Sequence, residues 1–394
     1  MKVLLYGDFR SPHARGWHQG LISAGIDVIA VSSETVSDYE ALNPEDVVSR
    51  LRQRFVDSRA TVKGSAVKDG GQSAVTKFKR TLSWLARSQV FHSIVHLLRS
   101  RALRSRLERL CELEKPDIVH ALRIPYEGVT ALDVHNDIPV VLSTWGSDFV
   151  PQASSDPLLA RWIRRRLHRA SGYQYDAHED LLRAGQYGLD ARVPALYAAG
   201  NFGVDLELFF VEQRGPMRTV VYPRRATPNS NFRGFVAAAI SLQSLPNTRF
   251  IGVGLASIQA DMESEFGRDA VARLTLTGNL SRKEMAELMR SADVVVSPTF
   301  WDGTPLTVLE ALASGARVVA GDLAELRELQ SQGLAIDLIN AGDTTAIASG
   351  IRRALEAVSV TAEQTVLPAP FNRAANVSRV TDFYTRVLLA SKSA

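Results

Sequence analysis

Short apolar runs alternate with longer segments of helical periodicity along most of this chain. Such alternation predicts parallel sheets whose strands are joined by crossover helices. In the first half, strands are expected at residues 3–6, 27–31, 117–121, 139–143, 172–175 and 195–198. In the second half, they are expected at 219–222, 249–253, 272–277, 293–297, 317–320 and 334–336. Two sets of similar size predict an α/β protein with two Rossmann-like, doubly wound domains.

The boundary between the two domains is expected in the polar, turn-rich segment at residues 201–218. We assign residues 1–207 to the first domain and 208–373 to the second. A last helix, at about 374–394, follows a proline-containing stretch and is expected to join the first domain.

The composition is that of a globular protein, with 394 residues of which 45% are hydrophobic and 22% charged. This length exceeds what one core usually supports. The single cysteine, Cys111, excludes an internal disulfide and is expected to be a small core residue. Residues 1–7 do not resemble a signal peptide, and no apolar run is long enough to span a membrane. A cytoplasmic location is therefore expected.

Two stretches concentrate positive charge although the formal net charge is only +4. Residues 77–110 carry lysines and arginines against Glu108 alone, interleaved with apolar residues, and residues 161–169 form a second arginine cluster. This pattern is typical of cationic amphipathic helices on an anionic membrane, which would make the protein peripheral on the inner face. The alternative is a solvated helix face that packs its apolar side on the sheet. Nucleic acid is not expected as a partner, because no binding module accompanies the charge.

The segment from 293 to 320 reads as strand, loop, helix and strand. Thr304 is expected to be the N-cap of the helix and Pro305 its first residue. The free backbone N–H groups of Leu306 and Thr307 would then point out of the helix start. This end carries partial positive charge, and it is therefore a candidate phosphate site.

Two carboxylates accompany that helix start. Glu310 lies about 6 Å further along the helix axis, on the same face as Leu306. A diphosphate bound at the helix start would place a ribose near Glu310, and Asp302 in the loop would reach the group on the other side of the diphosphate. The alternative for Glu310 is a buried carboxylate that caps a neighbouring loop.

These residues resemble the retaining GT-B glycosyltransferases of family 4, the glycosyl transferases group 1. Asp302 and Glu310 look like the family's E-x7-E signature, with Asp in place of the first Glu. Residues 200–209 resemble the segment that enters the second domain, and residues 276–296 the stretch before the signature strand. First-domain strand ends are matched by residues 117–121 and 143–148. The resemblance covers nearly the whole chain.

The resemblance implies two Rossmann-like domains that face a cleft. It also implies transfer of a hexosyl group, with retention, from a nucleotide-diphosphate sugar to an acceptor. The acceptor would be a small molecule, a glycan or a lipid-linked compound such as an intermediate of surface polysaccharide. No cofactor is expected. The chain has no Asp-x-Asp pair, which favours metal-independent stabilisation of the leaving group by cations. A non-catalytic nucleotide-sugar-binding protein and a related epimerase remain as alternatives.

The resemblance assigns the donor to the second domain. Glu310 would accept hydrogen bonds from ribose hydroxyls, and Asp302 would bind the hydroxyls of the donor sugar; both are taken as catalytic residues. Arg225, or its neighbour Arg224, and Arg233 would bind the diphosphate, since arginine can contact phosphate through two N–H groups. Further donor contacts are expected at Gly7, Asn279, Leu280, Gly303, Thr304, Leu306 and Thr307.

The first domain departs more from the family. Trp145 stands where many relatives carry a histidine. Asp148, taken as a catalytic residue, and His120 are expected to supply the lost contacts, and a core or capping role is the alternative for His120. Acceptor contacts are expected at Ser11, His13, Arg15, Trp145 and His120.

Overall fold

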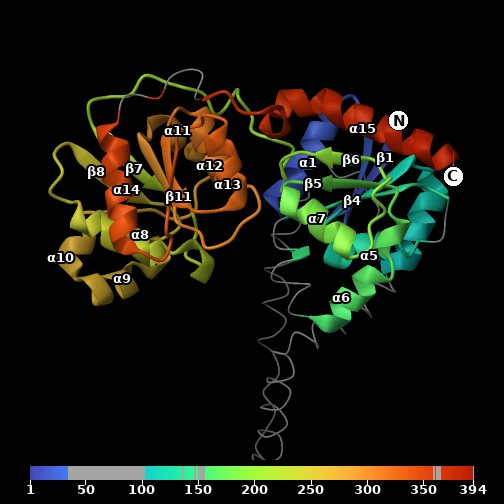
Figure 1. Ribbon diagram of the computed structural model, residues 1–394, viewed down its shortest axis with the longest axis horizontal. Coiled ribbons are helices and arrows are strands. Elements are labelled where there is room, and N and C mark those ends of the chain that lie inside the picture. The colour runs from blue at the N-terminus through green and yellow to red at the C-terminus, as the bar shows by residue number, and fades with distance from the viewer. Residues whose placement is uncertain are drawn as a thin grey trace, which may run out of the picture. The chain divides into compact units, whose positions relative to one another are not determined.

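The computed structural model describes residues 1–33, 103–134, 137–145, 148–149, 156–357, 360 and 365–393. The chain divides into two compact units (Figure 1). The first comprises Met1–Asn201 and Val377–Ala394, and the second comprises Phe202–Asn376. Most of the basic stretch at 77–110 lies outside the described residues.

Six parallel strands form the sheet of the first unit, in the order β2-β1-β3-β4-β5-β6. These strands are β1 (Lys2–Gly7), β2 (Asp27–Ser32), β3 (Ile118–Leu122), β4 (Val140–Ser143), β5 (Gly172–Tyr175) and β6 (Ala195–Tyr197). The sheet grows outward from β1 in both directions, so the strand order reverses between β1 and β3. Such a reversal defines a doubly wound fold.

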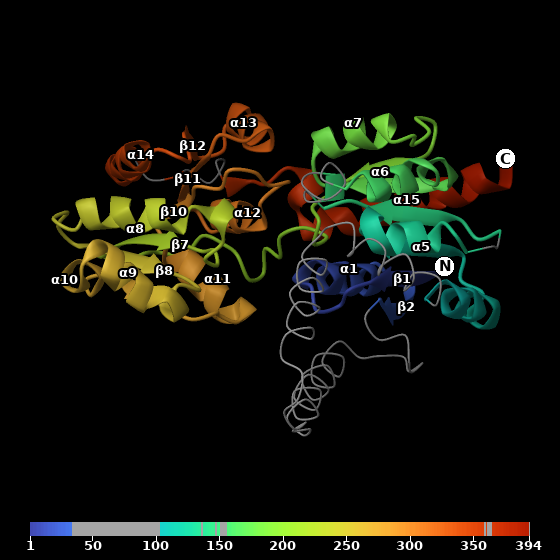
Figure 2. The ribbon, with the colours of Figure 1, turned by 90° about the horizontal axis from the view of Figure 1, so that it is seen from below.

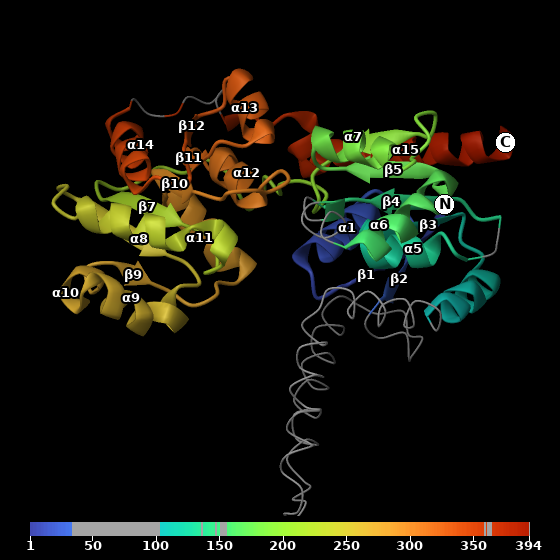
Figure 3. The same ribbon diagram turned by 60° about the horizontal axis from the view of Figure 1, so that its bottom comes forward.

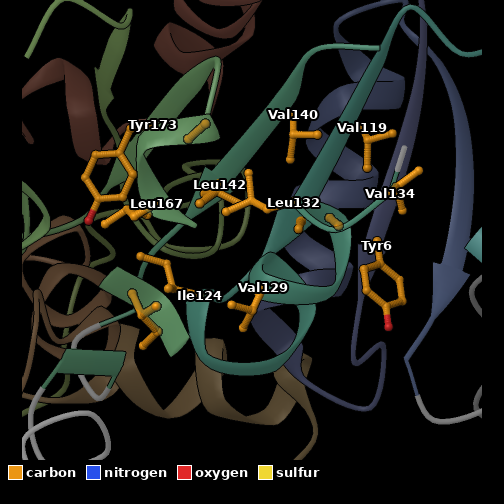
Figure 4. Close-up of a cluster of buried hydrophobic side chains, with 14 of the residues drawn as sticks. Tyr6, Val119, Ile124, Val129, Leu132, Val134, Val140, Leu142, Leu167 and Tyr173 are labelled. Carbon is orange, nitrogen blue, oxygen red and sulfur yellow. The ribbon is translucent and has the colours of Figure 1, made fainter. Parts of the chain in front are cut away.

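Helices cover both faces of this sheet. Leu4 and Tyr6 face a buried apolar cluster that a helix at residues 103–114, α5, α6 and α7 also line (Figure 4). Trp17 and Tyr384 instead contact His120 on the opposite face, which α1 and α15 cover. Cys111 is buried in the first cluster, as expected. The helices are α1 (Pro12–Ser23), α5 (Val129–Ala131), α6 (Pro157–Arg164), α7 (His178–Gln186) and α15 (Arg373–Ser393), with shorter helical turns at Ile124–Gly128 and Leu167–Arg169.

The second unit repeats this architecture with the strand order β12-β11-β10-β7-β8-β9, all parallel. Its strands are β7 (Arg218–Tyr222), β8 (Thr248–Gly252), β9 (Thr275–Leu276), β10 (Val294–Ser297), β11 (Arg317–Gly321) and β12 (Ile336–Ile339). The strand order reverses between β7 and β10.

Helices also lie on both faces of the second sheet (Figure 2). Val220, Val296 and Val319 pack with α8 and α14, while the alternate strand positions point to the other face. Helix α12 packs beside β10 and β11 and contacts α11 (Figure 3). The helices are α8 (Phe232–Ser241), α9 (Gln259–Phe266), α10 (Arg268–Val271), α11 (Arg282–Ser291), α12 (Leu306–Ala313), α13 (Ala324–Ser331) and α14 (Thr344–Glu356), with 3-10 turns at Pro228–Ser230, Ala256–Ile258 and Ala369–Phe371.

The fold class predicted from the sequence is confirmed, and eleven of the twelve expected strands coincide with observed ones, whereas β12 at Ile336–Ile339 shares only Ile336 with the strand expected at 334–336. The start of α12 corrects one expectation. Pro305 is the N-cap with φ −71° and ψ 113°, no side chain caps the helix, and Leu306 is the first helical residue. Thr304 therefore precedes the cap. The carbonyl of Pro305 accepts the first helical hydrogen bonds from Val308 and Leu309, at 3.0 and 3.3 Å.

Among the described residues, no helix combines the length and the apolar character that crossing a membrane requires.

Candidate functional site

The carboxyl ends of β7 and β10 define a candidate site in the second unit. In doubly wound sheets, ligands bind outside the carboxyl ends of the strands where the strand order reverses. The loop from β7 to α8 and the loop from β10 to α12 leave the sheet at this position. Residues of these two loops are therefore the first candidates for ligand contacts.

The two loops are tied together by side chains. Arg224, after β7, forms an ion pair with the carboxylate of Asp302, after β10. The side-chain amide of Asn229 donates to the carbonyl of Trp301 at 2.7 Å and accepts from its N–H at 3.1 Å. Both partners of the ion pair are partly exposed. Asp302 is thus held at the switch point of the sheet with its carboxylate open to solvent on one side.

Glu310 lies in the second turn of α12 and is buried. Its Oε1 accepts a hydrogen bond from Nη1 of Arg282 at 2.9 Å. Burial raises the pKa of Glu310, and the positive charges of Arg282 and then Arg373 oppose this rise without cancelling it. The carboxylate is therefore held by cations in a largely water-excluded position.

Three hydroxyl groups near β10 and the start of α12 have no hydrogen-bond partner among the described residues. They belong to Ser297, Thr299 and Thr307, and each oxygen is buried. A buried hydroxyl without a partner costs free energy, so these groups usually bind water or a ligand. Their position beside the helix start favours a polar, anionic ligand there.

The structure distinguishes between the arginines expected at the diphosphate. Arg224 contacts Asp302, whereas Arg225 is exposed and its backbone packs against Gly254. Arg233 is also exposed and pairs with Glu265 at 2.9 Å. Of these three arginines, the structure brings only Arg224 to a predicted carboxylate.

The other expected donor residues lie in two loops. Gly303 and Thr304 are buried in the loop between β10 and α12. Asn279 is exposed and Leu280 half-buried, between β9 and α11. Among the described residues, no cluster of three or more His, Cys, Asp or Glu side chains has the geometry to hold a metal ion.

In the first unit, Asp148 joins the loops that follow β3 and β4. Its Oδ1 accepts from Nε of Arg123 at 3.0 Å, and its Oδ2 accepts from the N–H groups of Ile124 and Trp145 at 3.1 and 3.4 Å. Asp148 is 1% exposed, and burial raises its pKa while Arg123 opposes the rise. Asp148 therefore holds these loops, a role that differs from the predicted catalytic one. Arg123 has φ 100°, a strained conformation for a residue with a side chain.

Two of the expected acceptor residues lie in contact with each other. Ser11 caps α1, and the imidazole of His13 packs on the indole of Trp145 with ring centroids 4.9 Å apart. The backbone of Gly200 packs against these side chains. A Cβ at this position would lie 3.0 Å from Oδ2 of Asp176 and 3.3 Å from both the His13 and the Trp145 ring. His13, Trp145 and Asp176 thus meet at the carboxyl edge of the first sheet.

Gly7 and Arg15 have local structural roles. A Cβ at Gly7 would lie 3.1 Å from the side chain of Leu122, so glycine permits close packing of β1 and β3. Arg15 donates to the carbonyls of Phe9 and Arg10 at 3.0 and 2.8 Å and thereby fixes the loop before α1.

His120 is a core residue, which corrects its assignment to the acceptor. It is fully buried, and its ring nitrogens lie 2.6 Å from the hydroxyl of Tyr384 and 2.7 Å from that of Ser143. Burial lowers the pKa of His120 to about 3. The neutral ring therefore links α15 to the sheet, the alternative considered from the sequence.

Glu127 is a buried carboxylate that the sequence did not single out. Its Oε1 accepts from the hydroxyl of Ser33 at 2.8 Å, and Oε2 has no partner among the described residues. Burial raises the pKa of Glu127 to about 7, although Arg123 acts in the opposite direction. Glu127 lies in the π-helical turn after β3, close to the switch point of the first sheet.

Glu127→Gln should change how stability depends on pH. Between the usual pKa of 4.5 and about 7, folded Glu127 keeps a proton that the unfolded chain releases, so stability falls as pH rises through this window. Glutamine does not titrate. On going from pH 5 to pH 8, the free energy of unfolding of the variant should therefore increase by about 3 kcal/mol relative to that of wild type. Urea unfolding at both pH values measures this, with Glu179→Gln on the surface of α7 as the control. Parallel pH profiles of wild type and Glu127→Gln would contradict the assignment.

Comparison with known proteins agrees with this geometry. Residues 217–357 match the family described as Glycosyl transferases group 1. The chain is 29% identical over 266 residues to sulfoquinovosyl transferase SQD2 of Arabidopsis thaliana, covering 61% of this chain and 50% of that protein. It is 29% identical over 176 residues to D-inositol 3-phosphate glycosyltransferase of Mycobacterium ulcerans (strain Agy99), covering 40% and 37%. The chain thus spans about half the length of the first relative and less of the second.

Solved structures show the same fold. Sucrose-phosphate synthase from Thermosynechococcus elongatus superimposes with a TM-score of 0.72 at 14% identity, covering 99% of this chain and all of that one. Anabaena HepE in complex with UDP superimposes with a TM-score of 0.63 at 15% identity, covering 98% of this chain and 100% of that one. These structures show that the chain shares their two-domain fold. The family match at residues 217–357 lies within the second unit, where the Arg224–Asp302 pair and Glu310 are found.

Within the GT-B fold, sequence reasoning missed Asn229, Arg282 and Arg373. Arg282 follows Ser281, whose capping box with Glu284 marks the start of α11, but nothing in the local sequence connects it to Glu310. Arg373 carries no local sequence signal for its interaction with Glu310.

Proposed function

We propose that this chain is a retaining, metal-independent glycosyltransferase of family 4 that moves a hexosyl group from a nucleotide-diphosphate sugar to an acceptor. The observation that carries the proposal is the arrangement at the switch point of the second sheet. A helix start with buried, unpartnered hydroxyls lies between an Arg–Asp pair and a buried glutamate. Anabaena HepE, which shares the fold, has been solved with UDP and with UDP-glucose, which supports a nucleotide-sugar donor.

The side chains suggest a division of roles at the donor. The start of α12 and Arg224 would stabilise negative charge on the leaving diphosphate, as preorganised dipoles and cations do in phosphate-releasing reactions. Glu310 would accept hydrogen bonds from the ribose. Asp302, which Arg224 holds, would bind hydroxyls of the sugar being transferred.

The acceptor would bind to the first unit, where His13, Trp145 and Asp176 meet. The aromatic surface of Trp145 and the polar atoms beside it are suited to the apolar and polar faces of a sugar or polyol. One relative, 29% identical over 104 residues, is an Escherichia coli enzyme that transfers galactose to a GlcNAc-diphosphoundecaprenol. This supports a lipid-linked or surface-glycan acceptor for the present chain.

A donor screen with product analysis tests the proposal. The full chain is incubated with UDP-, GDP-, ADP- and dTDP-sugars, and release of nucleoside diphosphate and free or transferred sugar is measured. The proposal expects one donor to be consumed, without added metal and in the presence of a chelator, and the anomeric configuration of the product to match that of the donor. Conversion of a nucleotide sugar into its epimer would favour an epimerase, and binding without any turnover would favour a non-catalytic protein.

We further propose that helix α6 places the first unit on an anionic membrane. Arg161 and Arg164 are exposed on α6, Arg165 is exposed at its C-cap, and Leu158 on the same helix is 43% exposed. Each basic residue near an anionic surface contributes about 1 kcal/mol to binding. The arginines and the exposed leucine match what a cationic interfacial helix presents.

Arg161→Glu combined with Arg165→Glu should weaken binding to phosphatidylglycerol vesicles by at least about tenfold at physiological salt. Flotation of the full chain with phosphatidylglycerol and with phosphatidylcholine vesicles measures this. The matched control is Arg352→Glu with Arg353→Glu, which makes the same change of charge on α14 of the second unit. If the wild-type chain does not bind the anionic vesicles, the membrane proposal is wrong.

A further inference from the structure

The two carboxylate oxygens of Glu310 have different surroundings. Oε1 accepts the hydrogen bond from Nη1 of Arg282 at 2.9 Å, whereas no described residue donates a hydrogen bond to Oε2. The Glu310 side chain is 6% exposed. One oxygen of a buried carboxylate is therefore occupied by the protein, and the other remains available to a ligand.

Arg282 is itself held in place. It is the first residue of α11, and the capping box of Ser281 and Glu284 fixes the helix start. Its guanidinium group lies over the ring of Phe209, 5.0 Å from the centroid, and Phe209 is fully buried. Cation–π contact and helix capping thus limit the positions that the guanidinium can adopt.

Arg373 provides a second positive charge near Glu310. Its Nη1 lies 3.9 Å from Oδ2 of Asp205, and it also interacts electrostatically with Glu310 and Arg282. The backbone around it is fixed, because Asn376 donates to the carbonyls of Phe202 and Pro370 at 3.1 and 2.9 Å. Arg373 therefore faces Glu310 from a different part of the chain than Arg282 does.

Arg282 also influences the protonation of Glu310. Burial favours the protonated form of Glu310, and Arg282 is the largest influence in the opposite direction, ahead of Arg373. A protonated carboxyl loses acceptor strength, while an ionised one accepts strong hydrogen bonds from hydroxyl groups. The charged groups that face Glu310 are Arg282 and Arg373, with Asp205 next to Arg373.

We propose that Arg282 is a positioning residue of the nucleotide site, which holds Oε1 of Glu310 and thereby orients Oε2 toward a ribose hydroxyl of the nucleotide. Arg373 is the weaker second support. This inference rests on the proposed function, because it requires the ribose of a nucleotide to bind at Glu310. It adds a residue to the site that the carboxylate signature does not contain.

The test compares Arg282→Gln, Arg282→Lys and Glu310→Gln with wild type. Calorimetry with UDP, GDP, ADP and dTDP identifies the tightest nucleoside diphosphate, whose affinity is then followed from pH 6 to pH 9. Arg282→Gln should weaken binding by at least about tenfold at pH 7, the loss expected for a hydrogen bond to a charged group. The affinity of this variant should recover toward pH 9, because Glu310 without Arg282 ionises only at higher pH. Arg282→Lys, which keeps the charge, should stay within about threefold of wild type.

Arg290 is a matched control on the same helix. It pairs with Glu212 at 2.9 Å and lies over the ring of Phe210 at 4.8 Å, so Arg290→Gln removes a similar ion pair and a similar aromatic contact away from Glu310. The affinity of Arg290→Gln for the nucleoside diphosphate should equal that of wild type at every pH. Equal losses in Arg282→Gln and Arg290→Gln, or an Arg282→Gln variant with the wild-type pH profile, overturn the positioning role.

The outcomes separate the inference from the proposed function. If Glu310→Gln loses affinity and Arg282→Gln does not, the function stands and the inference is wrong. If wild type binds none of the four diphosphates, both are wrong.

Discussion

Glu310→Ala should weaken binding of the nucleoside diphosphate by about tenfold to a hundredfold, the range expected when a charged hydrogen-bond acceptor is removed. The reason is that Glu310 is a buried carboxylate near the start of α12, and no described residue donates a hydrogen bond to its Oε2. Since binding energy on the nucleotide also positions the sugar, kcat/KM should fall further, by about a hundredfold or more. Calorimetry and initial rates on the donor chosen by the screen measure the two effects.

The matched control for this variant is Glu265→Ala. Glu265 also pairs with an arginine of the second unit, Arg233, at 2.9 Å, but on the exposed surface beside α8. Its loss should leave binding and rate within about twofold of wild type, because exposed ion pairs contribute little. Near-normal kinetics of Glu310→Ala would contradict the placement of the ribose at Glu310.

Asp302→Ala should lower the transfer rate much more than it lowers nucleotide affinity. The carboxylate of Asp302 pairs with Arg224 and is assigned to the donor sugar, so its removal frees Arg224 for the diphosphate while the sugar loses its contact. We expect kcat to fall by about a hundredfold and the dissociation constant of the nucleoside diphosphate to stay within about threefold. Comparing single-turnover rates with binding of the diphosphate alone separates these effects.

Asp322→Ala is the control for Asp302. Asp322 follows β11 in the same unit and pairs with Arg327 at 2.6 Å, but this pair is exposed. Asp302→Glu adds one methylene and should change the ranking of donor sugars more than the rate with the best one. Equal losses of nucleotide affinity and rate in Asp302→Ala would show that Asp302 contacts the nucleotide rather than the sugar.

The strands could be predicted from the sequence because a parallel sheet buried on both faces requires continuous apolar runs. Val294–Ser297 and Ile118–Leu122 are apolar apart from Ser297 and His120, and every residue in them is buried. β9 was predicted less well, since only Thr275–Leu276 pair with β8 and neither residue is fully buried. Its short pairing leaves a weak apolar signal.

The site could be predicted only as far as its chemistry is local in sequence. Asp302, Glu310 and the start of α12 lie within one short segment, so their spacing alone indicates a shared site. Arg282 and Arg373 reach Glu310 from positions that are 28 and 63 residues away in the sequence. No local sequence pattern predicts such contacts. Likewise, only the directions of the side chains show that Arg224, and not Arg225, contacts Asp302.

In the first unit, the missing information was burial. His120 and Asp148 looked suited to a site because they are polar residues at strand ends. The structure shows both buried and fully engaged, by Tyr384 and Ser143 in one case and by Arg123 and two backbone N–H groups in the other. Polar residues that complete a buried network cannot be told from ligand-binding ones without knowing their neighbours.

The central claim is that the second unit binds a nucleotide-diphosphate sugar through Glu310 and the start of α12. The most direct test is calorimetric titration of wild type and Glu310→Ala, side by side, with UDP-, GDP-, ADP- and dTDP-glucose. We expect wild type to bind at least one of the four and Glu310→Ala to bind that same donor at least about tenfold more weakly. Equal affinity of the two proteins, or no binding of any donor by wild type, would contradict the claim.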